Sequence, residues 1–138
     1  MIRFFEISLK TTEETDILDI TQQAHEKVLQ SGIDDGSMLV FVGGSTGAVT
    51  TIEYESGVVN DLRKAIQRAC PREITYEHDL RWGDGNGYAH VRAAIVGPSL
   101  AVPIRRKRLL LGTWQQIVVL DFDNRPRERK VVIQIMGE

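Results

Sequence analysis

The sequence has only one cysteine, Cys70, among its 138 residues. A lone cysteine cannot form an internal disulfide or supply the thiolates of a cysteine-based zinc cluster. Long hydrophobic runs are also missing, since every apolar stretch falls far below the about 18 residues needed to span a bilayer. Glu6 lies where a signal peptide would carry its apolar segment. We therefore expect a soluble, cytoplasmic protein with no membrane partner.

An excess of positive charge is missing as well. The 17 basic and 19 acidic residues leave a formal net charge of -2, which offers no overall attraction for nucleic acid. What is present is an ordinary globular composition, with 42% hydrophobic and 26% charged residues. The length is that of one compact domain, so we expect a single domain over residues 1–138.

The hydrophobic pattern predicts an α+β fold in which a largely antiparallel sheet is layered with two main helices. Apolar residues at helical spacing predict helices over residues 17–29 and 61–69, and Pro71 ends the second. Strands are expected over residues 2–9, 37–42, 48–54, 100–104, 109–111, 116–122 and 130–136. The last two strands should form a hairpin around residues 123–126. Residues 76–87 should be a polar loop, and a short helix capped by Asn86 should follow, with a strand as the alternative.

One short segment, Glu77–His90, concentrates chemically active side chains. It holds two of the three histidines, three acidic residues and three alternating glycines. One interpretation is a site for a divalent metal or a phosphate-bearing substrate. The other is a long turn whose acidic residues cap helices and whose histidines make structural hydrogen bonds.

Three further segments allow both a functional and a structural interpretation. Gly43–Gly47 follows a strand and could bind an anion through backbone N–H groups, although a glycine-rich hairpin turn is favoured because the Walker lysine is missing. Glu53 and Glu55 would share a strand face. They could act as metal ligands or acid–base groups, or they could simply lie at an exposed strand end. Arg105–Arg108 lies between two short strands and is favoured as a solvated turn over a site that captures an anionic substrate.

Taken together, these segments resemble the UPF0047 or YjbQ-like family, also called the secondary thiamine-phosphate synthase family. The most specific strings are Gly-Asp-Gly-Asn-Gly at residues 83–87 and Leu-Gly-Thr-Trp-Gln at residues 111–115. The other matching segments, in the family's order, are residues 45–55, 76–79, 88–90, 97–99, 102–104, 116–117, 126–127 and Arg129. Two positions differ: Tyr88 stands where many members have histidine, and Arg105–Arg108 where many have an acidic residue and glycine.

The resemblance implies a homotrimer with a polar pocket near the subunit boundaries and weak thiamine-phosphate synthase activity. That reaction joins a hydroxymethylpyrimidine diphosphate to a thiazole phosphate and releases diphosphate. The alternatives are a non-catalytic trimer that binds a phosphorylated metabolite, and a metal-dependent hydrolase with His90 or Glu55 as the base.

Carried over by position, the resemblance also implies a set of site residues. The implied catalytic groups are Glu53, His78 and His90, and the implied ligands of a divalent ion, Mg²⁺ or Zn²⁺, are these three with Asp84. Substrate contacts are expected from Arg81 to phosphate, from Asn86 as an orienting amide, and from Trp114 and Gln115 beside a ring.

Overall fold

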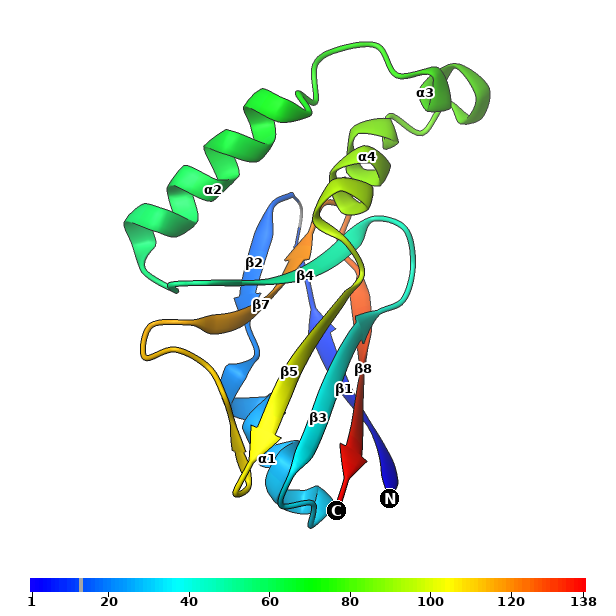
Figure 1. Cartoon of the computed structure of the whole chain (residues 1–138). Helices are drawn as coiled ribbons and strands as arrows, with labels where there is room; N and C mark the ends of the chain where they lie inside the picture. The colour runs from blue at the N-terminus through cyan, green and yellow to red at the C-terminus, as the bar shows by residue number, and fades with distance from the viewer. Residues whose placement is uncertain (13) are drawn as a thin grey trace.

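A computed structural model describes residues 1–12 and 14–138, which form two antiparallel sheets and four helices (Figure 1). The strands are β1 (Ile2–Lys10), β2 (Asp16–Asp19), β3 (Gly36–Val42), β4 (Gly47–Ile52), β5 (Ser99–Arg105), β6 (Arg108–Leu109), β7 (Gln116–Asp121) and β8 (Glu128–Gly137). The helices are α1 (Thr21–Ser31), α2 (Ser56–Ala69), α3 (Glu77–Trp82) and α4 (Gly87–Val96). This arrangement confirms the predicted α+β class.

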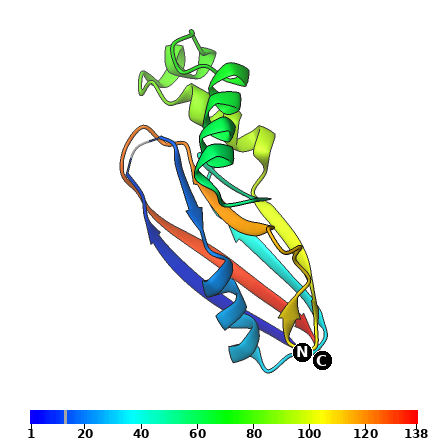
Figure 2. The same ribbon diagram turned by 90° about the vertical axis from the view of Figure 1, so that its left-hand side faces the viewer.

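The larger sheet has the strand order β1-β8-β3-β5-β6, and the smaller has the order β2-β7-β4. The alternation of β8 sets the inner face of the larger sheet, because Val131, Ile133 and Ile135 are fully buried while Lys130 and Met136 are exposed. Helix α1 lies against that inner face, as Figure 2 shows from the side. The buried strand residues therefore close a core between the larger sheet, α1 and the smaller sheet.

Strand β7 is the centre of the smaller sheet and is buried on both of its faces. Ile117 and Val119 pack into the core beneath the larger sheet, whereas Val118 and Leu120 pack into a second core beneath α2 and α4. This explains why residues 116–122 form a nearly continuous apolar run instead of an alternating one. The protein is thus layered as larger sheet, smaller sheet and helices, and α2, α3 and α4 lie at the end away from both termini, whereas α1 lies near the termini (Figure 1).

Most of the strands expected from the sequence are confirmed, but the hairpin around residues 123–126 is wrong. Strand β7 pairs with β2 and β4, whereas β8 pairs with β1 and β3, so the two strands belong to different sheets. Gly43–Gly47 is likewise not a hairpin turn, because it carries the chain from β3 in one sheet to β4 in the other. Turn-forming residues mark where a chain bends, but they do not determine which strands then pair.

The helix boundaries also differ from the expected ones. Residues 17–19 belong to the edge strand β2, and α1 begins only at Thr21, whose backbone N–H donates to the Asp19 carboxylate at 2.9 Å. Residues 77–82 form the short helix α3 instead of a loop. Helix α4 is confirmed over the strand alternative, although Asn86 does not cap it with its side chain. Among the described residues, no helix is long and apolar enough to cross a membrane.

Helix α2 begins at Ser56, five residues before the predicted start at residue 61, because Glu55 caps it. The Glu55 carboxylate accepts hydrogen bonds from the backbone N–H groups of Gly57 at 2.7 Å and Val58 at 2.9 Å. These bonds lower the pKa of Glu55, because they stabilise its ionised form. In the structure, Glu55 is therefore a helix-capping residue.

Replacing Glu55 by alanine should lower the melting temperature at neutral pH, because two N–H groups of α2 lose their acceptor. Since the folded-state pKa is the lower one, the contribution is complete above the unfolded-state pKa and disappears as the pH falls through the folded-state pKa. Thermal unfolding of E55A and the parent protein between pH 7 and pH 3 measures this. The matched control is E53A, since the Glu53 side chain has no such cap bonds, and an equal loss in both variants would contradict the prediction.

Candidate functional site

A cavity of about 560 Å³ opens where the chain crosses between the two sheets. Its walls come from the 43–46 turn, the loop between α3 and α4, helix α4 and the first residues of β8. The lining residues are Gly43, Gly44, Ser45, Thr46, Asp84, Asn86, His90, Arg127, Glu128, Arg129 and Lys130. Three basic side chains, an imidazole and a glycine-rich turn therefore face one hollow. A second hollow of about 300 Å³ adjoins it along Gly47, Ala93 and Pro98.

The glycine-rich turn is held over a buried arginine. The Arg129 guanidinium donates to the Asp121 carboxylate through Nε at 3.0 Å and also through Nη2, which reaches the Thr46 hydroxyl at 2.7 Å. A Cβ atom at Gly47 would lie 3.2 Å from the centre of this guanidinium, and one at Gly44 would lie 3.4 Å from Nη1. Gly44 also has a φ of +100°, a backbone conformation that side chains disfavour. Glycine therefore allows the turn to approach Arg129.

A second buried pair lies beside the first. The carboxylate of Asp123, which is fully buried, accepts from the Thr46 hydroxyl at 2.9 Å and from Nε of Arg127 at 3.0 Å. Burial alone would raise the pKa of Asp123, but the hydrogen bonds from Thr46 and Arg127 outweigh it and hold the pKa below its usual value. The two aspartates thus hold Arg127 and Arg129 in place, and these arginines line the cavity whereas the aspartates do not.

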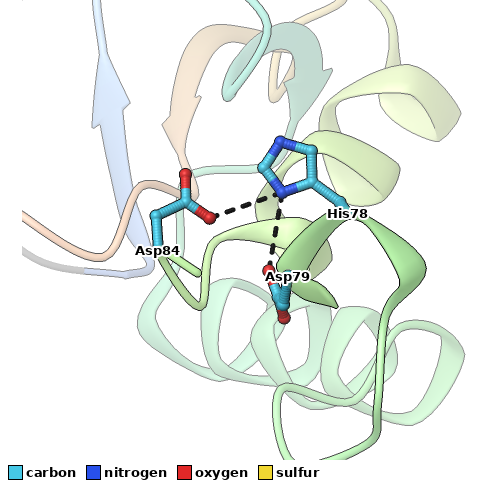
Figure 3. A group of neighbouring side chains, drawn as sticks. All are labelled: His78, Asp79 and Asp84. Atoms are coloured by element: carbon cyan, nitrogen blue, oxygen red, sulfur yellow. Dashed lines mark hydrogen bonds and ion pairs between the residues drawn. The ribbon is translucent and has the colours of Figure 1, made fainter. Parts of the chain in front are cut away.

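The histidine and acidic residues of α3 and its following loop meet at the rim of this cavity. Nδ1 of His78 lies 3.4 Å from a carboxylate oxygen of Asp84 and 3.5 Å from one of Asp79 (Figure 3). The His90 ring, from α4, packs against the His78 ring with 4.4 Å between their centroids. The structure therefore brings together three of the residues predicted for a metal site, His78, Asp84 and His90.

Asp79 completes this cluster and was missed as a ligand in the sequence. Its carboxylate accepts from the backbone N–H of Gly87 at 2.9 Å, so it links the start of α4 to α3. Ligand atoms of His78, Asp79 and Asp84 all lie within 4.8 Å of one another. Its only signal in the sequence was its position next to His78. In a segment predicted to be a loop, that position does not show which way the Asp79 side chain points.

The other predicted site residues lie elsewhere on the chain. Glu53 is exposed between β4 and α2 and is not part of the histidine cluster, and Trp114 is 71% exposed in the loop before β7. Gln115 uses both ends of its amide within the chain, accepting from the Gly112 N–H and donating to Thr51. Arg81 is exposed on α3, with its guanidinium 5.6 Å from the ring centroid of Trp82. Their roles at a site remain predictions, and within one described chain they do not line the cavity.

Tyr88, which stands where many members of the resembled family have histidine, is fully buried in the second core. The guanidinium carbons of Arg72 and Arg92 lie 5.1 and 4.7 Å from its ring centroid. Burial, with a smaller effect of the Glu14 charge, raises the pKa of Tyr88 to about 12. The phenol is therefore neutral at physiological pH, and it is not among the residues that line the cavity.

Fold and site together define a two-sheet α+β protein with a polar cavity built from a glycine-rich crossover and a histidine–carboxylate cluster. The sequence matches the family described as UPF0047 protein YjbQ-like over residues 5–138. The chain belongs to that family.

Relatives from distant organisms share nearly the whole chain. A UPF0047 protein from Archaeoglobus fulgidus is 37% identical over 95% of this chain and 99% of its own length. The UPF0047 protein YugU from Bacillus subtilis is 33% identical over 95% of this chain and 97% of its own length. Among solved structures, a hypothetical protein from Aeropyrum pernix superposes with a TM-score of 0.92 at 32% identity, covering 99% of both chains. A protein of unknown function from Sulfolobus solfataricus, described as YbjQ-like, gives 0.90 at 30% identity, covering 100% of both.

Proposed function

We propose that the protein binds a divalent cation and a phosphorylated small molecule in the 560 Å³ cavity and acts as a thiamine-phosphate synthase. The observation that carries the proposal is the meeting of a glycine-rich turn, basic side chains and a histidine–carboxylate cluster at one hollow. Phosphate groups are bound by backbone N–H groups and by charged donors of this kind. The synthase reaction itself comes from the family resemblance.

Arg129 supports the phosphate part of the proposal. Its Nε and Nη2 atoms are occupied by Asp121 and Thr46, whereas Nη1 takes part in none of the hydrogen bonds among the described residues. That nitrogen lies next to Gly44 on the cavity wall. Because Asp121 holds the rest of the guanidinium in place, a phosphate oxygen would meet a donor that is already oriented.

The donor set also fits a divalent ion. Ligand atoms about 2.1 Å from one ion lie no more than roughly 4.2 Å apart. Both His78 distances, 3.4 and 3.5 Å, satisfy this limit, and the three ligand atoms as a set lie within 4.8 Å of one another, close to it. One imidazole and two carboxylates suit Mg²⁺ or Zn²⁺. His78, Asp79 and Asp84 would hold the ion, which would neutralise charge on a departing diphosphate. His90 and Asn86 would then face the substrate from the cavity wall.

The trimer is part of the same proposal. The outer face of the larger sheet carries exposed apolar side chains that a neighbouring copy would cover, namely Phe4, Leu39, Phe41 and Met136. Lys130 and Glu128 lie on this face and also line the cavity, so a neighbouring subunit would approach the cavity rim. Glu53, Arg81 and Trp114 are exposed and would be available for contacts between subunits.

The test is a synthase assay with the pyrimidine diphosphate, the thiazole phosphate and Mg²⁺, measuring thiamine phosphate. Wild type should form product, and H90A should form little or none, since His90 lines the cavity and contacts His78. The matched control is H25A, which removes the histidine of α1 that lies in neither the cavity nor the cluster. Product formation by H90A at the wild-type rate would contradict the proposal.

Metal binding is measured separately by calorimetry on wild type, H78A and H25A. We expect H78A alone to lose affinity, by about 10-fold or more, because it removes a direct ligand. If no product forms but the substrates raise the melting temperature, the function is non-catalytic binding of a phosphorylated metabolite instead of thiamine-phosphate synthesis. Unchanged metal affinity in H78A would exclude the metal site.

A further inference from the structure

The β5–β6 hairpin presents four consecutive basic residues at the end of the molecule opposite α3 and α4 (Figure 1). Arg106 and Lys107 form its two-residue turn with φ angles of 50° and 63°. Such turns strongly prefer asparagine and glycine, because other side chains disfavour positive φ at both central positions. The tip is nevertheless held firmly, because the N–H of Arg106 donates to the Asp35 carboxylate and that of Lys107 to the Asp34 carbonyl, both at 2.9 Å.

The charges on this hairpin also destabilise it. Arg105 and Arg108 lie directly opposite each other across the strand pair, where like charges repel. Lys107 has an acidic partner, Asp34, at 3.5 Å. In contrast, the guanidinium groups of Arg105, Arg106 and Arg108 take part in no ion pair or hydrogen bond within residues 1–12 and 14–138. Conflicts of this kind between local sequence and structure are expected at functional positions.

The three unpaired arginines, Arg105, Arg106 and Arg108, line a hollow of about 600 Å³ together with Leu110. Lys107 is not among the residues that line it. We propose that this hollow is a second anion-binding site, separate from the cavity beside Gly43–Gly47, and that it takes a small molecule with at least two phosphoryl groups. Guanidinium groups suit this ligand, because their planar donors match phosphate oxygens in pairs. A diphosphate would also relieve the repulsion between Arg105 and Arg108.

The size of the basic surface favours a small anion over nucleic acid. The hollow has the volume of a small-molecule site, and its lining is limited to three arginines and one leucine. Single-stranded nucleic acid would require a longer basic groove with aromatic side chains for base stacking, and no aromatic residue lines this hollow among the described residues. The protein as a whole carries a net charge of -2, so it offers no overall attraction for nucleic acid beyond its local basic surfaces.

The experiment is a titration of the ¹⁵N-labelled full chain with inorganic diphosphate, followed by amide correlation spectra. Amides of residues 104–110 should shift and saturate, and orthophosphate should bind them more weakly. Replacing Arg106 or Arg108 by glutamine should weaken this binding about 10-fold or more, because each change removes a charge-assisted hydrogen bond. The same variants should leave any shifts at residues 43–47 unchanged, so failure of the cavity proposal and failure of this one are distinguishable.

The matched control is K107Q, which removes one positive charge from the same turn without altering the hollow. We expect its diphosphate affinity to stay close to that of wild type. The proposal is overturned if diphosphate does not shift the hairpin amides at low salt. It is also overturned if K107Q weakens binding as much as R106Q, or if an oligonucleotide saturates the same amides at lower concentration than diphosphate.

Discussion

Replacing Arg129 by leucine is expected to lower the free energy of unfolding by about 3–5 kcal/mol, because it leaves the Asp121 carboxylate buried without its partner. Asp121 is fully buried and Arg129 is 8% exposed, so water cannot readily replace the lost guanidinium. The Thr46 hydroxyl loses a donor as well. This effect exceeds that of a surface ion pair, which contributes at most about 1 kcal/mol.

Urea denaturation at a fixed protein concentration measures the change. R125L is the matched control, because Arg125 is exposed in the loop before β8 and makes no ion pair or hydrogen bond with the described residues. The double variant D121L/R129L should regain much of the lost stability, since it removes both charges together. A loss below about 1 kcal/mol in R129L would contradict the prediction, as would a double variant no more stable than the single one.

Replacing Gly87 by alanine is expected to lower the free energy of unfolding by about 1–3 kcal/mol through overpacking, and to weaken the metal binding that we propose by about 10–100-fold. A Cβ atom at this position would lie 2.5 Å from Cβ of Tyr76 and 3.1 Å from a carboxylate oxygen of Asp79. Helix α3 would have to move away from α4. That movement would separate Asp79 from the Gly87 N–H and His78 from His90.

Alanine has a higher helix propensity than glycine, and this difference alone would raise the free energy of unfolding, but by at most about 1 kcal/mol. G83A is the comparison variant, because Gly83 has a φ of +67° but no atom within 4 Å of an added Cβ. It should lose stability through backbone strain while keeping its metal affinity. Denaturation and metal calorimetry on both variants separate these effects, and equal metal affinities in G87A and G83A would show that α3 does not move.

Local signals in the sequence were sufficient for most elements but not for their assembly. The alternation of β1 and the helical spacing of α2 predicted the existence and type of both elements, though not the start of α2, because each depends on one buried face. The hairpin after β7 failed because β7 is buried on both faces, so that its pattern does not indicate which strands are its neighbours. Ile17 and Ile20 fit a helical spacing by chance, since one lies in β2 and the other precedes α1.

The proximity of the candidate site residues was predictable only where they are close in sequence. His78, Asp84 and His90 belong to one short segment, and the chain folds back on itself to bring them together. The contribution of Arg129 depends on pairing across the two sheets, so its partner Asp121 cannot be identified from a local pattern. The alternation of β8 does signal that Arg129 is buried, since it falls in phase with the buried Val131 and Ile133, and a buried arginine requires a partner.

The β5–β6 hairpin has a consequence for how this protein can change. Its tip is fastened mainly through backbone N–H groups, and Arg105, Arg106 and Arg108 are exposed and belong to neither core. They can therefore be exchanged without repacking either core, whereas a change at Arg129 or Gly47 alters both the interior and the cavity. The hairpin sequence can thus change while the rest of the fold is maintained, so the anion binding that we propose for it can be gained or lost independently of the cavity beside Gly43–Gly47.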